Sequence, residues 1–469
     1  MVKKSPENTT PAIVDNVEAL EAKLAQMREA QALFATYTQE QVDKIFYEAA
    51  MAANKARIPL AKMAIEETGR GVLEDKVIKN HYAAEYIYNA YKNTKTCGVL
   101  ERDEAYGITK IAEPIGIVGA VIPTTNPTST AIFKTLISLK TRNAIIISPH
   151  PAAAKCTIAA AKLVLDAAVK AGAPEGIIGW VDVPSIELTN MVMRDVDIIL
   201  ATGGPGMVKA AYSSGTPCYG VGQGNVQVLV DEGFTDYDQI TSNILASRTN
   251  DAGTNCTGEQ TLYVPQRQKA DLIAAFEAKG CVCVCDPADI DKLRKGIFPD
   301  GGPINRLVPG KQPKDALAEV GVTIPDCPLV LVDLESYGAQ EPLAREILFP
   351  ILRVNSYTDF EEALAEAKAN LLLEGAGHSS SIYSNDDARI LHAGMVLPVC
   401  RLSVKMPNVA VTGLPFSNGM PPTITIGCGT WGGNSGSDNL NYTHLLNKTR
   451  IIRTLEHYTE KDIDKIFLD

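Results

Sequence analysis

The chain has 469 residues, of which 45% are hydrophobic and 21% are charged, and its formal net charge is −11. The length predicts at least two domains, and the composition is typical of a globular protein. The acidic balance disfavours a broad nucleic-acid surface, which needs a basic face, but allows a local basic pocket for an anionic ligand.

Membrane and secretory signals are not visible in the sequence. The longest apolar stretches, at 115–122 and 144–147, are far shorter than the ~20 residues of a spanning helix. The N-terminal residues MVKKSP lead into polar sequence rather than an apolar signal region. We therefore expect a cytoplasmic protein with no membrane and no nucleic-acid partner.

The ten cysteines are too sparse for a disulfide scaffold. Cys281, Cys283 and Cys285 alternate along one expected strand, at intervals of ~6–7 Å that suit joint ligation of a metal poorly. The six histidines show no paired ligand spacing. We expect structural cysteines here and no metal site.

The first expected elements form an N-terminal helical layer. Residues 1–15 are polar and are expected to fray, whereas apolar positions between 17 and 35 recur at helical spacing. Thr38 is expected to cap the helix that follows it. Helical character continues to about residue 93, and we expect this layer to cover a sheet.

Short strands alternate with helices from about residue 108 onward. This alternation predicts βαβ units, and the nearly continuous apolar strands predict a parallel sheet covered on both faces. A second unit is expected between about 246 and 427, with helices at 269–278 and 360–369, and the chain is expected to end in a helical tail. The expected strands of the first unit are 115–122, 144–147, 177–181 and 198–201, and its helices are 128–140, 152–171 and 207–213.

One cysteine stands in a polar loop between an expected helix and an expected strand. The segment DAGTNCTGEQ at 251–260 places Cys256 where a thiol can meet a ligand. A reactive thiolate needs nearby donors or positive potential. A single loop cysteine is more often incidental, so the surrounding segments must decide its role.

Three further segments follow expected strands. TGGPG at 202–206 presents backbone N–H groups at a helix start, as an anion site needs, but a tight turn without ligand explains it equally well. GVGQGN at 220–225 implies close approach of the backbone to a ligand or a neighbouring strand. Asn126 stands where its amide can donate to an oxyanion or cap the next helix.

These segments together resemble the aldehyde dehydrogenase superfamily; in chain order they are PTTNP at 123–127, SPHP at 148–151, ATGGPG at 201–206, GVGQGN at 220–225, Cys256 and EILFP at 346–350. The resemblance is closest to the aldehyde dehydrogenase half of bifunctional aldehyde–alcohol dehydrogenases and to CoA-acylating succinate-semialdehyde dehydrogenases. It runs from about residue 17 to about residue 452.

The resemblance implies an α/β fold, aldehyde dehydrogenase-like, with a Rossmann-type cofactor-binding domain plus an α/β catalytic domain. The implied boundaries are 1–245 for the cofactor-binding domain with its N-terminal helical layer and 246–426 for the catalytic domain. Residues 427–469 are expected to return to the cofactor-binding or oligomerisation region. Homodimers or homotetramers are the habit of the family.

The resemblance also implies site residues. Cys256 matches the nucleophile that forms a thiohemiacetal and then a thioester, and Asn126 matches the asparagine that stabilises the oxyanion with the cysteine N–H. His378 matches a histidine near the CoA-facing side. The implied cofactor is NAD, with NADP as the alternative, and coenzyme A is the implied co-substrate. The residues implied around the cofactor are Thr124, Thr125, Ser148, His150, Pro151, Gly203, Gly204, Gly222 and the ribose-binding Glu346.

Hydrolytic members of the superfamily carry a water-activating glutamate at the start of an ELGG-like segment, but the matching segment here begins GVG at 220–222. General-base assistance is typically worth ~10²–10⁴ in rate, so unassisted water should lose to a thiol. We therefore expect a CoA-acylating aldehyde dehydrogenase, an enzyme that converts aldehyde, CoA and NAD(P)+ to acyl-CoA and NAD(P)H. The alternatives are a hydrolytic enzyme, a reductase of an acyl phosphate, and a catalytically silent scaffold.

Acetaldehyde is the single most expected substrate. If the polar residues around the cysteine line the pocket, a polar or anionic aldehyde such as sulfoacetaldehyde or succinate semialdehyde becomes the alternative, because a buried unpaired polar group costs ~1–3 kcal/mol. Some of them could instead point into the loop or to water. The chain ends at Asp469, so an iron-dependent alcohol dehydrogenase half is not expected. The polar residues are Asn250, Thr254, Asn255 and Thr257.

Overall fold

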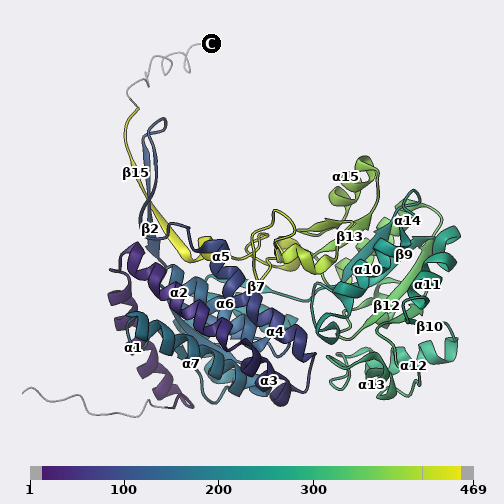
Figure 1. Cartoon of the computed structure of the whole chain (residues 1–469), viewed down its shortest axis with the longest axis horizontal. Helices are drawn as coiled ribbons and strands as arrows, with labels where there is room; N and C mark the ends of the chain where they lie inside the picture. The colour runs from purple at the N-terminus through teal and green to yellow at the C-terminus, as the bar shows by residue number, and fades with distance from the viewer. Residues whose placement is uncertain (1–12, 415, 456–469) are drawn as a thin grey trace, which may run out of the picture.

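The computed structural model describes residues 13–414 and 416–455 and shows an α/β fold with three sheets (Figure 1). The predicted fold class is confirmed. Most of the polar leader predicted at 1–15 lies outside the described residues. In the described part of the chain, no helix combines the length and the apolar character needed to cross a membrane.

The first sheet is parallel and has five strands in the order β5-β4-β3-β6-β7. Every residue of β3 and of β4 is buried, because helices cover both faces of the sheet. The strands are β3 (Ile117–Ile122), β4 (Ala144–Pro149), β5 (Ile178–Trp180), β6 (Ile198–Thr202) and β7 (Cys218–Val221).

The helical layer predicted at the N-terminus is present. The Thr38 cap is confirmed as part of a capping box, in which Thr38 and Gln41 satisfy each other's backbone N–H groups. Helix α6 begins at Pro127 and is buried along its whole length. The helices of this unit are α1 (Val17–Phe34), α2 (Gln39–Lys55), α3 (Arg57–Thr68), α4 (Leu73–His81), the π-helix η1 (Tyr82–Tyr86), α5 (Ile87–Tyr91), α6 (Pro127–Lys140), α7 (Ala154–Ala171), α8 (Ile186–Asp195) and α9 (Pro205–Ser213).

The second sheet is also parallel and has seven strands in the order β10-β11-β12-β9-β8-β13-β14. Strand β8 lies inside this sheet between β9 and β13, although its residues fall within the first predicted domain, 1–245. The chain therefore enters the second sheet before α10. The strands are β8 (Val226–Val230), β9 (Glu259–Pro265), β10 (Val282–Val284), β11 (Val330–Asp333), β12 (Ile351–Tyr357), β13 (Ser380–Tyr383) and β14 (Leu402–Val404).

Helices pack around the second sheet; α11 and α14 match the two predicted segments within a few residues, and α12, α13 and α15 were not predicted. The 3-10 turn η3 (Asn250–Gly253) follows α10 and leads to the loop of Cys256, which ends where β9 begins. The helices are α10 (Tyr237–Arg248), α11 (Lys269–Glu277), α12 (Pro287–Ile297), α13 (Pro313–Ala318), α14 (Phe360–Leu373) and α15 (Asp387–Val396).

A third, antiparallel sheet of three strands projects from the first unit (Figure 1). It joins β1 (Gly98–Asp103) and β2 (Ile108–Pro114) to β15 (Leu446–Ile452). The prediction of a helical tail is wrong for β15, because pairing with β2 overrides the weak helical pattern of these residues. The rest of that predicted tail, from residue 456, lies outside the described residues.

Candidate active site

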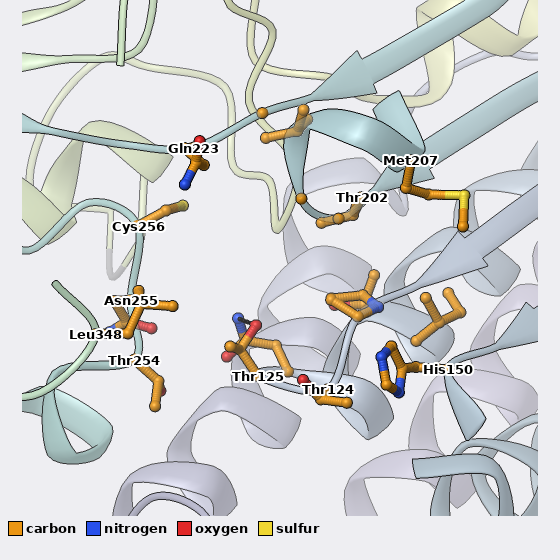
Figure 2. Close-up of a pocket in the computed structure, with 18 of the residues that line it drawn as sticks. Thr124, Thr125, His150, Thr202, Met207, Gln223, Thr254, Asn255, Cys256 and Leu348 are labelled. Atoms are coloured by element: carbon orange, nitrogen blue, oxygen red, sulfur yellow. Dashed lines mark hydrogen bonds between the residues drawn. The ribbon is translucent and has the colours of Figure 1, made fainter. Parts of the chain in front are cut away.

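A cavity of about 1210 Å³ lies between the two units. The carboxyl ends of β3, β4 and β6 open into it, which is where ligands bind in parallel α/β sheets. Figure 2 shows Cys256 and its loop on one wall, with Thr124, Thr125 and His150 on the other. The predicted site residues that line the cavity are Cys256, Asn126, Thr124, Thr125, Ser148, His150, Pro151, Gly203, Gly204, Gly222 and Glu346.

The backbone around Cys256 is held in an unusual path. Asp251 and Ala252 have φ of 53° and 51°, a left-handed conformation that non-glycine residues rarely adopt. The carbonyl of Cys256 packs against Gly224, where a Cβ would lie 1.8 Å from the oxygen. Only glycine fits at 224, so the glycine segment at 220–225 packs directly against the loop of Cys256.

The Cys256 thiol is protonated at neutral pH in this structure. Burial raises its pKa to about 12, and the nearby Glu346 carboxyl and Cys428 thiol raise it further, whereas Lys79 acts to lower it. A nucleophile in this position needs its proton removed and its charge stabilised as the reaction proceeds.

Asn126 does not cap α6. It occupies the N-cap position, but its side chain makes no capping hydrogen bond. Its Oδ1 instead accepts a hydrogen bond from Nζ of Lys79 at 2.7 Å, and its Nδ2 donates to Oγ1 of Thr125 at 3.3 Å. The side chain lines the cavity that Cys256 also lines. The arrangement fits the oxyanion role and not the capping alternative.

The turn after β6 fits a nucleotide. Helix α9 has no side-chain cap, and the N–H of Gly206 has no partner among the described residues and is available to an anion, whereas Met207 and Val208 donate to the carbonyl of Gly204. A Cβ on Gly204, Gly206 or Gly222 would meet nothing within 4 Å, which leaves space beside the backbone. The buried Lys134 ties the ends of β3 and β6 together through Val121, Leu200 and Thr202.

Glu346 lies against the nucleophile loop. Its Oε1 accepts from the N–H of Gly224 at 3.0 Å. Burial raises the pKa of Glu346 to about 8, in spite of that hydrogen bond, and the carboxyl is therefore mostly protonated at neutral pH. Its neighbour Glu374 pairs with Arg345 and accepts from the backbone N–H of Glu346.

His378 is the predicted site residue that the cavity does not bring to Cys256. It is fully buried and is not among the lining residues. Burial, with Arg401 nearby, lowers its pKa to about 3, so the ring is neutral. Nδ1 lies 2.9 Å from Oγ of Ser379, and Nε2 has no hydrogen-bond partner among the described residues. Its direct chemical role stays a prediction.

The polar residues beside Cys256 do line the cavity, and part of their hydrogen-bonding capacity is satisfied within the protein. Asn255 donates to Oδ1 of Asn250 at 2.5 Å, and Thr254 donates to Asp251. Thr257 is buried and also lines the cavity. The amide nitrogen of Asn250 and the hydroxyl of Thr257 have no hydrogen-bond partner among the described residues, so these groups remain available to a polar ligand.

Sequence reasoning missed Lys79, Asp251 and Gln223. Lys79 and Gln223 line the cavity, and Asp251 accepts hydrogen bonds from both Lys76 and Lys79. The spacing of two lysines on one face of α4 was the available signal, but their common carboxylate lies 172 residues or more away in the chain.

The cavity between the two α/β units therefore has the Cys256 thiol and the glycine-rich turn at 203–206 among its lining. The sequence profile of the aldehyde dehydrogenase family matches residues 9–289. The aldehyde-alcohol dehydrogenase of Clostridium acetobutylicum is 48% identical over 439 residues, covering 92% of this chain and 51% of that protein. The succinate-semialdehyde dehydrogenase (acetylating) of Clostridium kluyveri is 40% identical over 440 residues, covering 93% of this chain and 96% of that protein.

Among solved structures, an acetylating aldehyde dehydrogenase from Geobacillus thermoglucosidasius superposes with a TM-score of 0.90 at 39% identity, covering 94% of this chain and 98% of that one. The chain belongs to the aldehyde dehydrogenase family, which confirms the resemblance seen in the sequence. It spans about half the length of the Clostridium acetobutylicum relative.

Proposed function

We propose that this chain is a CoA-acylating aldehyde dehydrogenase. The observation that carries the proposal is the set of carboxyl groups around Cys256. The position of the water-activating glutamate holds Gly220, Glu346 accepts a hydrogen bond from the N–H of Gly224, and Glu374 is paired with Arg345. Without a free carboxylate base, water is a weak acceptor for an acyl group, and a thiol takes its place.

Residues of the chain have separate roles in this reaction. The Cys256 thiol loses its proton to solvent and its sulfur attacks the aldehyde carbonyl, and the new oxyanion accepts from the Asn126 amide and the Cys256 N–H. A nicotinamide cofactor held by the Gly203–Gly206 turn and Glu346 would supply the hydride acceptor for the former aldehyde carbon. Cys256 then carries the acyl group as a thioester. The CoA thiol attacks that carbonyl, the bond to Cys256 breaks, and the Cys256 thiolate that leaves takes up a proton in place of the one that the CoA thiol releases.

The cofactor proposed is NAD, with NADP as the alternative. The Gly203–Gly206 turn would take the pyrophosphate, and Glu346 the nicotinamide ribose. His150 and Arg70 line the far part of the cavity, and burial lowers the pKa of both. A ratio of kcat/KM for the two cofactors decides between them, and a preference for NADP would overturn the choice.

The substrate proposed is a short uncharged aldehyde, acetaldehyde first. Lys79, a cavity-lining cation that lowers the pKa of Cys256, is already paired with Asp251, so it offers an anionic tail little attraction. The alternative is an anionic aldehyde such as succinate semialdehyde or sulfoacetaldehyde. The Clostridium kluyveri relative, a succinate-semialdehyde dehydrogenase, supports this alternative.

We also propose a homodimer or homotetramer in the cytoplasm. The outer edges of β1 and β15 are unpaired within the described chain, and Ile452 is 74% exposed. Such an edge is a ready template for a second strand. Light scattering during size exclusion measures the mass directly, and a monomer would contradict this part of the proposal.

The function is tested by following NADH absorbance with a panel of aldehydes, with and without CoA. The proposal predicts turnover that depends on CoA and yields acyl-CoA. Equal turnover without CoA, with free acid as product, would identify a hydrolytic enzyme. No signal with any aldehyde would identify a scaffold, and reduction of acyl phosphates but not of acyl-CoA would identify the third alternative.

A further inference from the structure

Lys79, near the end of α4, places its ammonium between two parts of the site. Its Nζ donates to Oδ1 of Asn126 at 2.7 Å and to Oδ2 of Asp251 at 2.6 Å. Asn126 follows β3 in the first unit, whereas Asp251 belongs to η3, which leads to Cys256 in the second. One side chain therefore joins the amide to the nucleophile loop.

Asp251 anchors that loop to α4. Burial by itself would raise the pKa of Asp251, but Lys79 and Lys76 lower it to about 2, so the carboxylate is charged at every working pH. The left-handed backbone at this residue persists only because the surroundings hold it. Its carboxylate accepts hydrogen bonds from Val72 N, Lys76 Nζ, Lys79 Nζ and Thr254 Oγ1.

The Lys79 ammonium also fixes the orientation of the Asn126 amide. An ammonium carries only donors, so it binds the amide oxygen and turns the amide nitrogen away from itself. That nitrogen uses one N–H for Thr125, and its second N–H is left for an oxyanion. Among the described residues, Lys79 is the side chain that donates to Oδ1.

We propose that Lys79 is a positioning residue of the reaction. One ammonium fixes the donor face of Asn126 and, through Asp251, the position of the loop that carries Cys256. The inference deepens the proposed function and rests on it for the roles of Asn126 and Cys256. A positive charge at this place also favours the thiolate of Cys256 over the thiol.

Lys76 provides a matched control. It binds the same carboxylate at 2.9 Å and is more deeply buried than Lys79, with 3% against 14% of its side chain exposed. Its second contact is the backbone oxygen of Thr125 at 3.2 Å and not the amide of Asn126. Loss of Lys76 therefore weakens the Asp251 anchor without releasing the amide.

The test compares Lys79→Met with Lys76→Met in four measurements: thermal unfolding, cofactor binding, kcat for NADH formation, and the pH profile of Cys256 alkylation by iodoacetamide. For Lys79→Met we expect kcat to fall ~10²–10³-fold, the range for one lost oxyanion donor. We also expect its alkylation profile to shift to higher pH. Lys76→Met should lower the unfolding temperature at least as much, lose less than ~10-fold in kcat, and keep the alkylation profile.

Lys79→Arg keeps the charge, and we expect it to retain the wild-type alkylation profile and regain part of kcat; it also serves if Lys79→Met does not fold. Equal losses of kcat in the two methionine variants, in proportion to lost stability, would overturn the inference. An unshifted alkylation profile in Lys79→Met would overturn it too. Because alkylation needs neither aldehyde nor CoA, a wild-type enzyme that releases free acid would refute the proposed function alone.

Discussion

Gly224 and Cys256 are in backbone contact: a methyl group on Gly224 would lie 1.8 Å from the carbonyl oxygen of Cys256. The N–H of the same glycine donates to Glu346 at 3.0 Å. Gly224 therefore contacts both the loop of Cys256 and the carboxyl of Glu346, which we propose to bind the cofactor ribose. The close approach of a neighbouring backbone explains Gly224, whereas a Cβ on Gly220 would meet the side chains of Tyr212 and Val208 and one on Gly222 would meet nothing within 4 Å.

Gly224→Ala is expected to displace the nucleophile. The added methyl group must push the Cys256 loop aside, and a shift of about 1 Å can cost ~10²-fold in rate. We expect kcat to fall by that order, while cofactor binding changes less. Gly233→Ala is the matched control, because its methyl group meets no protein atom within 4 Å and Gly233 does not line the cavity. Equal kcat values for Gly224→Ala and wild type would show that the contact does not position the thiol.

Asp251 gives the chain a stability that depends on pH in the acid range. Its folded pKa of about 2 lies below the ordinary 3.8, so its contribution is present above pH 3.8 and is lost as the pH falls through 2. The contribution of Asp251 to the free energy of unfolding amounts to about 2 kcal/mol. Asp251→Asn removes this dependence and leaves Lys76 buried without its partner, which costs ~3–5 kcal/mol. Urea unfolding at pH 7 and pH 3 measures both, and an unchanged midpoint at pH 7 would contradict the anchor.

Glu346 is expected to lower the stability of the folded chain as the pH rises, which is the opposite of the effect of Asp251. Its folded pKa of about 8 lies above the ordinary 4.5, so stability falls as the pH rises from 4.5 through 8. Glu346→Gln should flatten that fall and raise the KM for the cofactor ~10-fold by weakening a ribose contact. Glu259, a buried carboxyl with its pKa raised to about 7 that does not line the cavity, is the control. Glu259→Gln should flatten the fall without changing that KM; a parallel change in KM would refute the ribose role.

Elements with strong local signals could be predicted from the sequence. Thr38 and Gln41 form their cap from neighbouring residues, and Pro127 starts α6 where proline is favoured. Strand β15 could not be predicted in this way, because its partner β2 lies more than 300 residues earlier in the chain. Its strand conformation comes from that pairing and not from its own residues.

The candidate site also contains residues that could be predicted from the sequence and residues that could not. Motif positions such as Cys256 and Gly203 were found because a family pattern carries them, and the cavity brings them together. Lys79 and Asp251 were missed because their importance depends on the hydrogen bond between them, which joins residues of two different units. His378 was found by pattern alone, and its burial away from the cavity could not be seen in the sequence.

The most direct measurement follows the acyl group itself. Enzyme mixed with acetaldehyde and NAD but no CoA is quenched, and the peptide that contains Cys256 is weighed by mass spectrometry; CoA is then added to a second sample. We predict an acetyl mass on Cys256 that CoA removes as acetyl-CoA much faster than water releases acetate. Cys256→Ala should carry none, whereas Cys285→Ala, at an exposed cysteine, should behave as wild type. Full turnover by Cys256→Ala, or an acyl group that leaves as acetate at the same rate with and without CoA, would contradict the account.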